Sequence, residues 1–169
     1  MNNDGMRRRL LYEMEEPTKI INVSNSNAGL YLGNCFSGKN YKEHGFTRIV
    51  NVTENNFPYT TPHLWISLPD REESDLFSKL ESSTDYIYQS LKSGHKVLIH
   101  CQAGISRSAT ITIAFVMRVL HKNLDDALEY VKAKRPIVNP NKGFIQQLKL
   151  FENFLNSNKK YFKITTKQI

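Results

Sequence analysis

The sequence predicts a single α/β domain built on a central mixed, mostly parallel sheet with helices on both sides. Short β-type segments alternate along the chain with segments whose apolar residues recur at helical spacing. The length of 169 residues is typical of one domain, and the 40% hydrophobic content is enough for one sizeable core.

Five short segments rich in β-branched and aliphatic residues are expected to form the strands. Asn, Gly, Ser or Pro residues, which favour turns, bound these segments. In chain order the expected strands are Ile20–Val23, Leu30–Leu32, Arg48–Val52, Leu64–Ser67 and Lys96–His100.

Four longer segments have the apolar spacing of helices that bury one face. Asn123 is placed to cap the third helix, and Pro136 stops it. The expected helices are Leu76–Leu91, Ala109–Leu120, Leu124–Val131 and Phe144–Leu155.

Both ends of the chain are polar and basic, so we expect the domain to occupy residues 19–157. We interpret residues 1–18 and 158–169 as basic tails that are mobile or loosely docked. The formal net charge of +7 would raise the local concentration of acidic partners. The tails could also make weak contact with anionic membranes.

Composition argues against several classes of protein. No apolar run approaches the roughly 20 residues that span a bilayer, and no apolar core follows the arginines at positions 7–9 to form a secretory signal. We therefore expect a cytoplasmic or nuclear location. The two cysteines, Cys35 and Cys101, do not form a Cys-x-x-Cys pair, so neither a disulfide framework nor a metal site or other cofactor is expected.

The most informative segment is Val97–Thr110, which places Cys101 at the end of an apolar strand and Arg107 where a helix begins. A tight strand-to-helix turn aims successive backbone N–H groups at an anion. Gly104 permits a backbone conformation that a Cβ would hinder. A positive site lowers the pKa of a cysteine from about 8.5, so Cys101 is expected to be a thiolate. Arg107 can bind two oxygens of a phosphate.

Two residues of this segment also have simpler explanations. A lone cysteine is more often a buried structural thiol, but the combination with Gly104 and Arg107 favours a nucleophile at Cys101. His100, at the end of the strand, is either a satisfied core residue or a group that orients the loop.

Residues 100–108 resemble the His-Cys-x-x-Gly-x-x-Arg-Ser/Thr signature of cysteine-dependent protein phosphatases, and residues 103–110 are most similar to the dual-specificity branch. The resemblance extends from about Tyr31 to Phe144. It implies the cysteine-phosphatase fold and a metal-free reaction, in which Cys101 forms a phosphocysteine that water hydrolyses. The residues expected to bind the phosphate are Gln102, Ala103, Gly104, Ile105, Ser106 and Arg107.

The resemblance also implies an aspartate general acid about thirty residues before the cysteine, and Asp70 fits this position. Asp70 would protonate the leaving oxygen and later accept a proton from water. Asp75 is the alternative, although it suits a cap at the start of the following helix better. Ser108 matches the family hydroxyl that helps the thiolate leave, and it could equally satisfy a backbone group in the first helical turn.

Three other residues stay outside the expected catalytic set. Asn139 and Asn141 lie in a turn that by resemblance packs near the phosphate loop, but turn chemistry around Pro140 and a cap for the last helix explain them equally well. Cys35 is expected to be structural, although some relatives form a protective disulfide with the catalytic cysteine.

The expected substrates are phosphorylated proteins. The chain lacks the larger catalytic domain of the tyrosine-specific branch, which favours a shallow pocket that admits phosphotyrosine, phosphoserine and phosphothreonine. A phosphoinositide substrate is one alternative, disfavoured because residues 102–106 contain no lysine, and a non-catalytic phosphopeptide-binding module is another. Nucleic acid is not expected, because no platform of aromatic and basic residues is evident. The sequence does not specify an oligomeric state.

Overall fold

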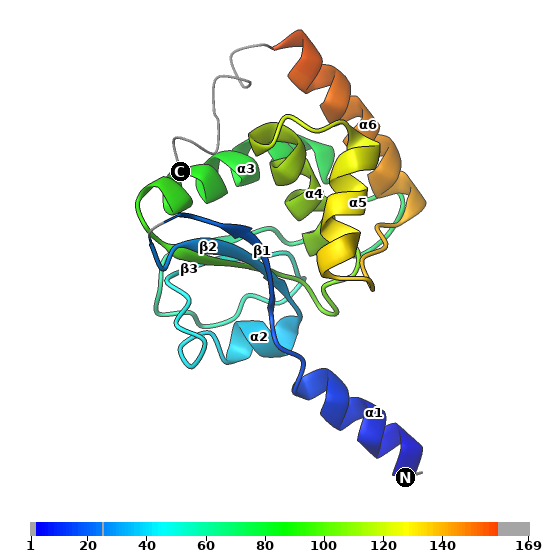
Figure 1. Cartoon of the computed structure of the whole chain (residues 1–169). Coiled ribbons are helices and arrows are strands. Elements are labelled where there is room, and N and C mark those ends of the chain that lie inside the picture. Colours follow the sequence, from blue (N-terminus) through cyan, green and yellow to red (C-terminus); the bar gives the residue numbers. More distant parts are fainter. Residues whose placement is uncertain (1–2, 25, 159–169) are drawn as a thin grey trace.

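The computed structural model describes residues 3–24 and 26–158, and these contain a five-stranded sheet (Figure 1). The strand order is β1-β2-β5-β3-β4; β1 is antiparallel to β2, and the other neighbouring strands are parallel. This arrangement confirms the expected mixed, mostly parallel sheet. The strands are β1 (Thr18–Asn22), β2 (Gly29–Gly33), β3 (Arg48–Asn51), β4 (His63–Trp65) and β5 (Lys96–His100).

Helices cover both faces of the sheet. Helices α3 to α6 lie together on one face, and the short α2 lies on the other (Figure 1). The described helices are α1 (Asn3–Glu13), α2 (Cys35–Lys39), α3 (Phe77–Lys92), α4 (Arg107–Val119), α5 (Leu124–Lys134) and α6 (Lys142–Ser157).

The two faces of the sheet bury cores of different size. In β5, Val97 and Ile99 belong to the large core, which α3 to α6 share, because successive side chains of a strand point to opposite faces. Leu98 lies in the smaller core, together with Ile49 and Phe46. Burial on both faces explains why β5 reads as a continuous apolar run.

The sheet brings three strand ends to one edge. In the parallel register His100 pairs with Gly33 of β2 on one side and with Asn51 of β3 on the other. Cys101 therefore leaves the sheet at the carboxyl ends of its central strands, where open α/β sheets bind their ligands.

The predicted strands and four helices are present with boundaries shifted by a few residues. Asn123 caps α5, as expected, by accepting a hydrogen bond from the Asp126 N–H at 2.8 Å. Helices α1 and α2 are not among the helices predicted from the sequence. The segment interpreted as a basic N-terminal tail includes α1, and Thr18 already belongs to β1. All but the first residue of the expected C-terminal tail lies outside the described residues.

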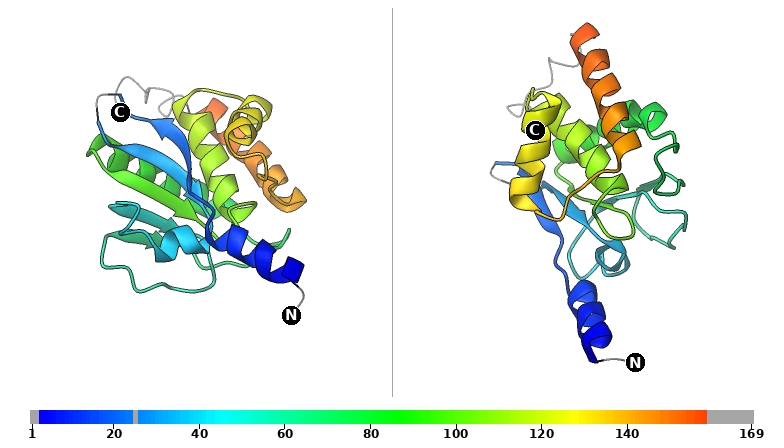
Figure 2. Two further views of the ribbon diagram at one scale, coloured as in Figure 1. Left: turned by 60° about the horizontal axis from the view of Figure 1, so that its bottom comes forward. Right: turned by 90° about the vertical axis from the view of Figure 1, so that its right-hand side faces the viewer.

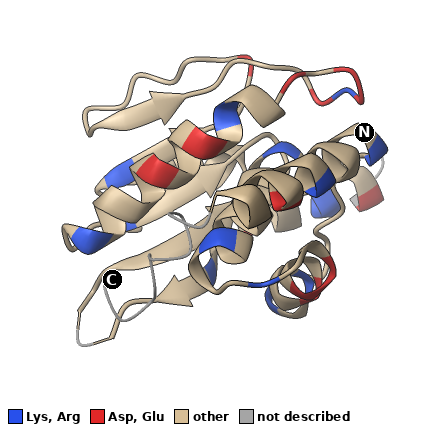
Figure 3. Ribbon diagram, turned by 90° about the horizontal axis from the view of Figure 1, so that it is seen from above, with Lys and Arg blue, Asp and Glu red and all other residues tan. Residues whose placement is uncertain are grey.

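Helix α1 projects from the body of the domain beyond the edge where β5 ends (Figure 2). Figure 3 shows that both signs of charge are spread over the helices and that acidic residues gather on the loop before α3. Within residues 3–24 and 26–158, no helix has both the length and the apolar character needed to cross a bilayer.

Candidate active site

The sulfur of Cys101 lies in the loop between β5 and α4, which we call the phosphate loop and define as residues 101–106. The Cys101 side chain is only 2% exposed. Its Sγ accepts hydrogen bonds from the backbone N–H of Gly104 at 3.3 Å and from the Ser108 hydroxyl at 3.0 Å. Two hydrogen-bond donors therefore converge on the Cys101 sulfur, one from the loop backbone and one from the first turn of α4.

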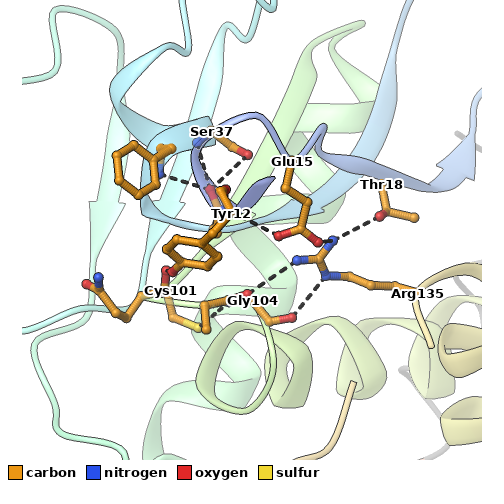
Figure 4. A network of polar contacts seen from close by, with 11 residues as sticks. Tyr12, Glu15, Thr18, Ser37, Cys101, Gly104 and Arg135 are labelled. Atoms are coloured by element: carbon orange, nitrogen blue, oxygen red, sulfur yellow. Dashed lines mark hydrogen bonds and ion pairs between the residues drawn. The ribbon is translucent and has the colours of Figure 1, made fainter. Parts of the chain in front are cut away.

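The carbonyl groups of the phosphate loop are held by donors outside it (Figure 4). Because each trans peptide points its C=O and the following N–H in opposite directions, outward carbonyls turn the next amides toward the other side of the loop. Gly104 N–H, which points at Cys101 Sγ, lies on that side. The donor–acceptor pairs are His100 Nδ1 to Cys101 O (3.2 Å), Cys35 N to Gln102 O (3.0 Å), Arg135 Nη2 to Ala103 O (3.3 Å), Arg135 Nε to Gly104 O (3.0 Å) and Asn139 N to Ile105 O (2.8 Å).

Glycine is the only residue type that fits position 104 without rearrangement of its surroundings. Its φ of +68° lies in the left-handed region that favours glycine. A Cβ at this position would lie 2.5 Å from the carbonyl oxygen of Gly33 and 2.8 Å from Arg135 Nη2. The phosphate loop therefore packs directly against the end of β2.

Arg107 presents a buried donor that has no protein partner. The side chain is 8% exposed, and its Nη1 donates to the Leu68 carbonyl at 3.1 Å, which fixes the guanidinium plane. Among the described side chains, Arg107 Nε is buried without a hydrogen-bond partner. An unsatisfied buried donor costs about 1–3 kcal/mol, so an oxyanion bound in the loop would relieve this cost.

Asp70 lies at the phosphate loop and Asp75 does not contact it. Asp70 Oδ1 accepts hydrogen bonds from Ser106 Oγ and from Asn141 Nδ2, both at 2.8 Å. Asp75 Oδ1 instead accepts from the Ser78 N–H at 3.1 Å, and this backbone hydrogen bond lowers the pKa of Asp75. Of the two candidate aspartates, Asp70 is thus the one that is hydrogen-bonded to the phosphate loop.

Asn141 was left out of the expected catalytic set, yet it holds Asp70. Its Oδ1 caps α6 by accepting from Phe144 N–H at 2.9 Å, while its Nδ2 faces Asp70 and its own N–H donates to Ser106 Oγ at 3.0 Å. The sequence predicts the role of Asn141 as a helix cap, in which its Oδ1 accepts a hydrogen bond. It does not predict the partner of Nδ2, the other polar atom of the same side chain.

His100 supports the loop as a neutral residue. Burial lowers the pKa of His100 to about 4, so its ring is uncharged at pH 7. The hydrogen bonds assign its tautomer: Nδ1–H donates to the Cys101 carbonyl, and Nε2 accepts from the Tyr59 hydroxyl at 2.6 Å. Burial also raises the pKa of Tyr59, which keeps this hydroxyl protonated.

Cys35 lies beside the phosphate loop and is, like Cys101, a free buried thiol. Its backbone N–H holds the Gln102 carbonyl, and its Sγ accepts from Gln102 Nε2 at 3.4 Å. Burial raises the pKa of Cys35, which favours the protonated form of this thiol. Within the described residues, no cluster of three or more His, Cys, Asp or Glu side chains is arranged to hold a metal ion.

A cysteine in an anion-binding strand-to-helix loop, with an arginine and a carboxylate at the same loop, defines the class of cysteine-dependent phosphatases. Residues 30–154 match the family model described as "Dual specificity phosphatase, catalytic domain", and the chain belongs to this family. It is therefore a protein phosphatase, a hydrolase of the protein-tyrosine-phosphatase type.

Individual relatives agree with this assignment. "Putative tyrosine phosphatase 123R" of Invertebrate iridescent virus 6 is 49% identical over 147 residues, which cover 87% of this chain and 99% of that protein. Mouse dual specificity protein phosphatase 1 is 36% identical over 149 residues, 85% of this chain but only 39% of the relative. The crystal structure of DUSP15 superposes with a TM-score of 0.78 at 35% identity, covering 88% of this chain and 94% of that one.

Proposed function

We propose that this chain hydrolyses phosphotyrosine and phosphoserine or phosphothreonine esters in proteins, through a phosphocysteine formed on Cys101. The observation that carries the proposal is the convergence on one loop of a sulfur that accepts two hydrogen bonds and an arginine with an unpaired buried Nε. A phosphate ester supplies the two features that this arrangement lacks: an electrophilic phosphorus and oxygens that accept from the loop.

In the first step Cys101 Sγ attacks phosphorus and the bond from phosphorus to the ester oxygen breaks. The leaving oxygen takes a proton from the Asp70 carboxyl group, which Ser106 and Asn141 hold at the loop. Arg107 and the inward amides stabilise the charge that spreads over the three remaining phosphate oxygens. The products of this step are the dephosphorylated hydroxyl group and a phosphocysteine.

In the second step a water molecule attacks the phosphorus of the phosphocysteine. The Asp70 carboxylate accepts a proton from this water, and the bond from phosphorus to sulfur breaks. Ser108 Oγ, 3.0 Å from Cys101 Sγ, donates to the sulfur as it leaves as a thiolate. Inorganic phosphate is released, and Asp70 is protonated again for the next cycle.

Dual specificity is supported by the family and by the relatives' names, which describe both tyrosine and dual-specificity phosphatases. A cytoplasmic or nuclear location is supported by the chemistry, since a cysteine nucleophile works as a reduced thiolate and reducing compartments preserve it.

The test is hydrolysis of phosphotyrosyl and phosphothreonyl peptides with a chelator present. We expect the intact protein to hydrolyse both, Cys101→Ser to abolish turnover, and Asp70→Ala to lower kcat by about 10²–10⁴. Asp75→Ala is the matched control, because it removes a nearby carboxylate that contacts Ser78 rather than the loop.

Three results would contradict the proposal. Undiminished turnover in Cys101→Ser would exclude the nucleophile, and equal losses in the Asp70 and Asp75 variants would exclude Asp70 as the specific acid. An intact protein that binds phosphopeptide tightly without turnover would be a binding module instead.

A further inference from the structure

The segment before the family match contributes side chains to the back of the phosphate loop. The family model begins at residue 30, yet Tyr12, near the end of α1, donates its hydroxyl to the Gln102 carbonyl (Figure 4). The Tyr12 ring packs edge-on against Phe36, with 5.5 Å between ring centroids. Burial raises the pKa of the Tyr12 phenol, so the hydroxyl keeps the proton that it donates.

A second link runs through Glu15 and Arg135. The Arg135 side chain is 3% exposed, and its Nη1 forms an ion pair with Glu15 Oε1 at 2.8 Å. The same guanidinium donates to the carbonyls of Ala103 and Gly104. Figure 4 shows Glu15 and Gly104 contacting the guanidinium of Arg135 at the same time.

The N-terminal segment is itself fastened to the domain. Asn34, which is fully buried, donates its Nδ2 to the Tyr12 carbonyl at 2.9 Å and to Glu15 Oε2 at 3.1 Å. The other half of the Asn34 amide caps α2. Asn34 and Arg135 thus hold the Glu15 carboxylate from two sides. These two contacts fix the position of the carboxylate.

These contacts act on the orientation of the peptides that bind phosphate. The carbonyls of Gln102, Ala103 and Gly104 are fixed by Tyr12 and Arg135, with the Cys35 N–H as an additional donor to Gln102. Since each of these carbonyls fixes the direction of the following N–H, the contacts aim three consecutive amides at the anion site. Pre-aimed donors need no reorganisation when charge develops.

We propose that Tyr12 and Glu15 are positioning residues of the active site, acting through the Gln102 carbonyl and through Arg135. Neither residue touches the reacting atoms. An effect of these residues on catalysis rests on the proposed function. Their effect on how tightly the loop binds a tetrahedral oxyanion does not depend on it.

Removing the negative charge of Glu15 distinguishes two roles for this residue, because the two roles predict opposite changes in phosphate binding. If Glu15 acted only as a nearby anion, removing it would tighten the binding of inorganic phosphate and lower the pH at which Cys101 becomes reactive. If it positions Arg135, removing it frees the guanidinium from the carbonyls of Ala103 and Gly104, and both quantities change in the opposite direction.

The experiment compares Glu15→Ala and Glu15→Gln in the full chain, since both remove the charge and only Gln keeps an acceptor at position 15. Thr18 Oγ1, which accepts from Arg135 Nη1 at 3.1 Å, is present in both variants. We expect Glu15→Ala to weaken the binding of inorganic phosphate about tenfold, and Glu15→Gln to restore part of the loss. The pH midpoint of Cys101 alkylation by iodoacetamide, followed at that residue by mass spectrometry, should rise in the same order. Tyr12→Phe keeps the ring on Phe36 and should weaken phosphate binding about threefold.

Matched controls separate positioning from general effects. Glu16→Gln removes the same charge from an exposed carboxylate that lies 3.5 Å from the His44 ring, and Tyr86→Phe removes a hydroxyl that donates to the Pro62 carbonyl. Both controls should leave phosphate binding and alkylation unchanged, and thermal unfolding by circular dichroism verifies that every variant is folded.

Equal effects of Glu15→Ala and Glu15→Gln, tighter phosphate binding, or a lower alkylation midpoint would overturn the proposal. Phosphate binding and alkylation do not depend on turnover. If the intact protein hydrolyses no phosphoester but the variants shift these two readouts as expected, the proposed function fails and the positioning role stands. If turnover is present and Glu15→Ala behaves like Glu16→Gln, the positioning role fails alone.

Discussion

The front and the back of the phosphate loop are built in different ways. The front, where Cys101 Sγ and the inward amides face the substrate, comes mainly from one continuous segment, residues 101–108. The back, where the loop carbonyls point, contacts residues from several segments: Tyr12, Gly33, Cys35, Arg135 and Asn139. The chemistry of this site is therefore local in the sequence, whereas the geometry that supports it depends on the whole fold.

The largest effect on this arrangement should come from Gly104→Ala, which pushes the loop away from its back. The new Cβ would meet the Gly33 carbonyl at 2.5 Å, and backbone of the central sheet cannot move aside as a flexible side chain would. Because a displacement of about 1 Å at a catalytic group costs roughly 10²-fold, we expect kcat/KM to fall by about 10²–10³. Steady-state kinetics on a phosphotyrosyl peptide measures the loss.

Gly94→Ala is the control for backbone strain. Gly94 also has a positive φ, +81°, but a Cβ there meets nothing within 4 Å. This variant should lose stability at its turn and retain kcat/KM. Similar kinetic losses in both variants would show that strain, rather than contact between the loop and β2, controls activity.

The second effect concerns His100, which supports the back of the loop, and the dependence of the protein's free energy of unfolding on pH. The folded pKa of His100 is about 4, below the value near 6.5 of an unfolded histidine. The unfolded chain therefore binds a proton as pH falls below 6.5, while the folded chain does not until pH 4. The free energy of unfolding should fall across this window by up to about 3 kcal/mol.

Urea unfolding at pH 7, 6 and 5 measures this dependence, with His100→Asn as the comparison. Asn does not titrate, so the variant should lose the His100 part of the slope whatever its stability at pH 7. Identical slopes in the two proteins would mean that His100 is protonated or exposed in the folded state, against the burial described above.

The smallest of these effects concerns Asn141, a front residue from a distant segment. Asn141→Asp keeps the cap of α6, since Asp caps helices as well as Asn, but replaces the donor to Asp70 with a second carboxylate. We expect kcat/KM to fall about tenfold, because Asp70 loses a charge-assisted hydrogen bond worth about 1.5–3 kcal/mol and faces a second carboxylate instead.

Asn123→Asp is a close match for this substitution. Asn123 caps α5, and its Nδ2 also donates to an aspartate, Asp126, at 3.1 Å. This second cap makes none of the contacts with Ser106 and Asp70 that Asn141 makes, so its variant should keep full activity. An Asn141 variant as active as the Asn123 variant would remove Asn141 from the front of the site.

The front of the site could be predicted because its spacing is short and its chemistry is specific. Cys101, Gly104, Arg107 and Ser108 lie within eight positions, and strand-to-helix context alone brings them together. The sheet and its four large helices were equally accessible, since apolar periodicity reports directly on burial.

The back of the site was not accessible in this way. From the sequence, Arg135 was interpreted as the end of a helix before Pro136. Residues 1–18 were interpreted as a tail, because a short polar segment has no apolar periodicity. Their importance depends on contacts such as Glu15 with Arg135, which join residues 120 positions apart and exist only after the sheet has formed. Asn141 shows the intermediate case, where one half of its amide was predictable and the other was not.

The unpaired Nε of Arg107 has a consequence for the end of the catalytic cycle. Inorganic phosphate can satisfy this nitrogen as well as an ester can, so product release leaves a buried donor unsatisfied again, at a cost of about 1–3 kcal/mol. Under the proposed mechanism, the atom that helps to capture the substrate also slows the departure of the product, and millimolar phosphate should raise the melting temperature of the resting enzyme.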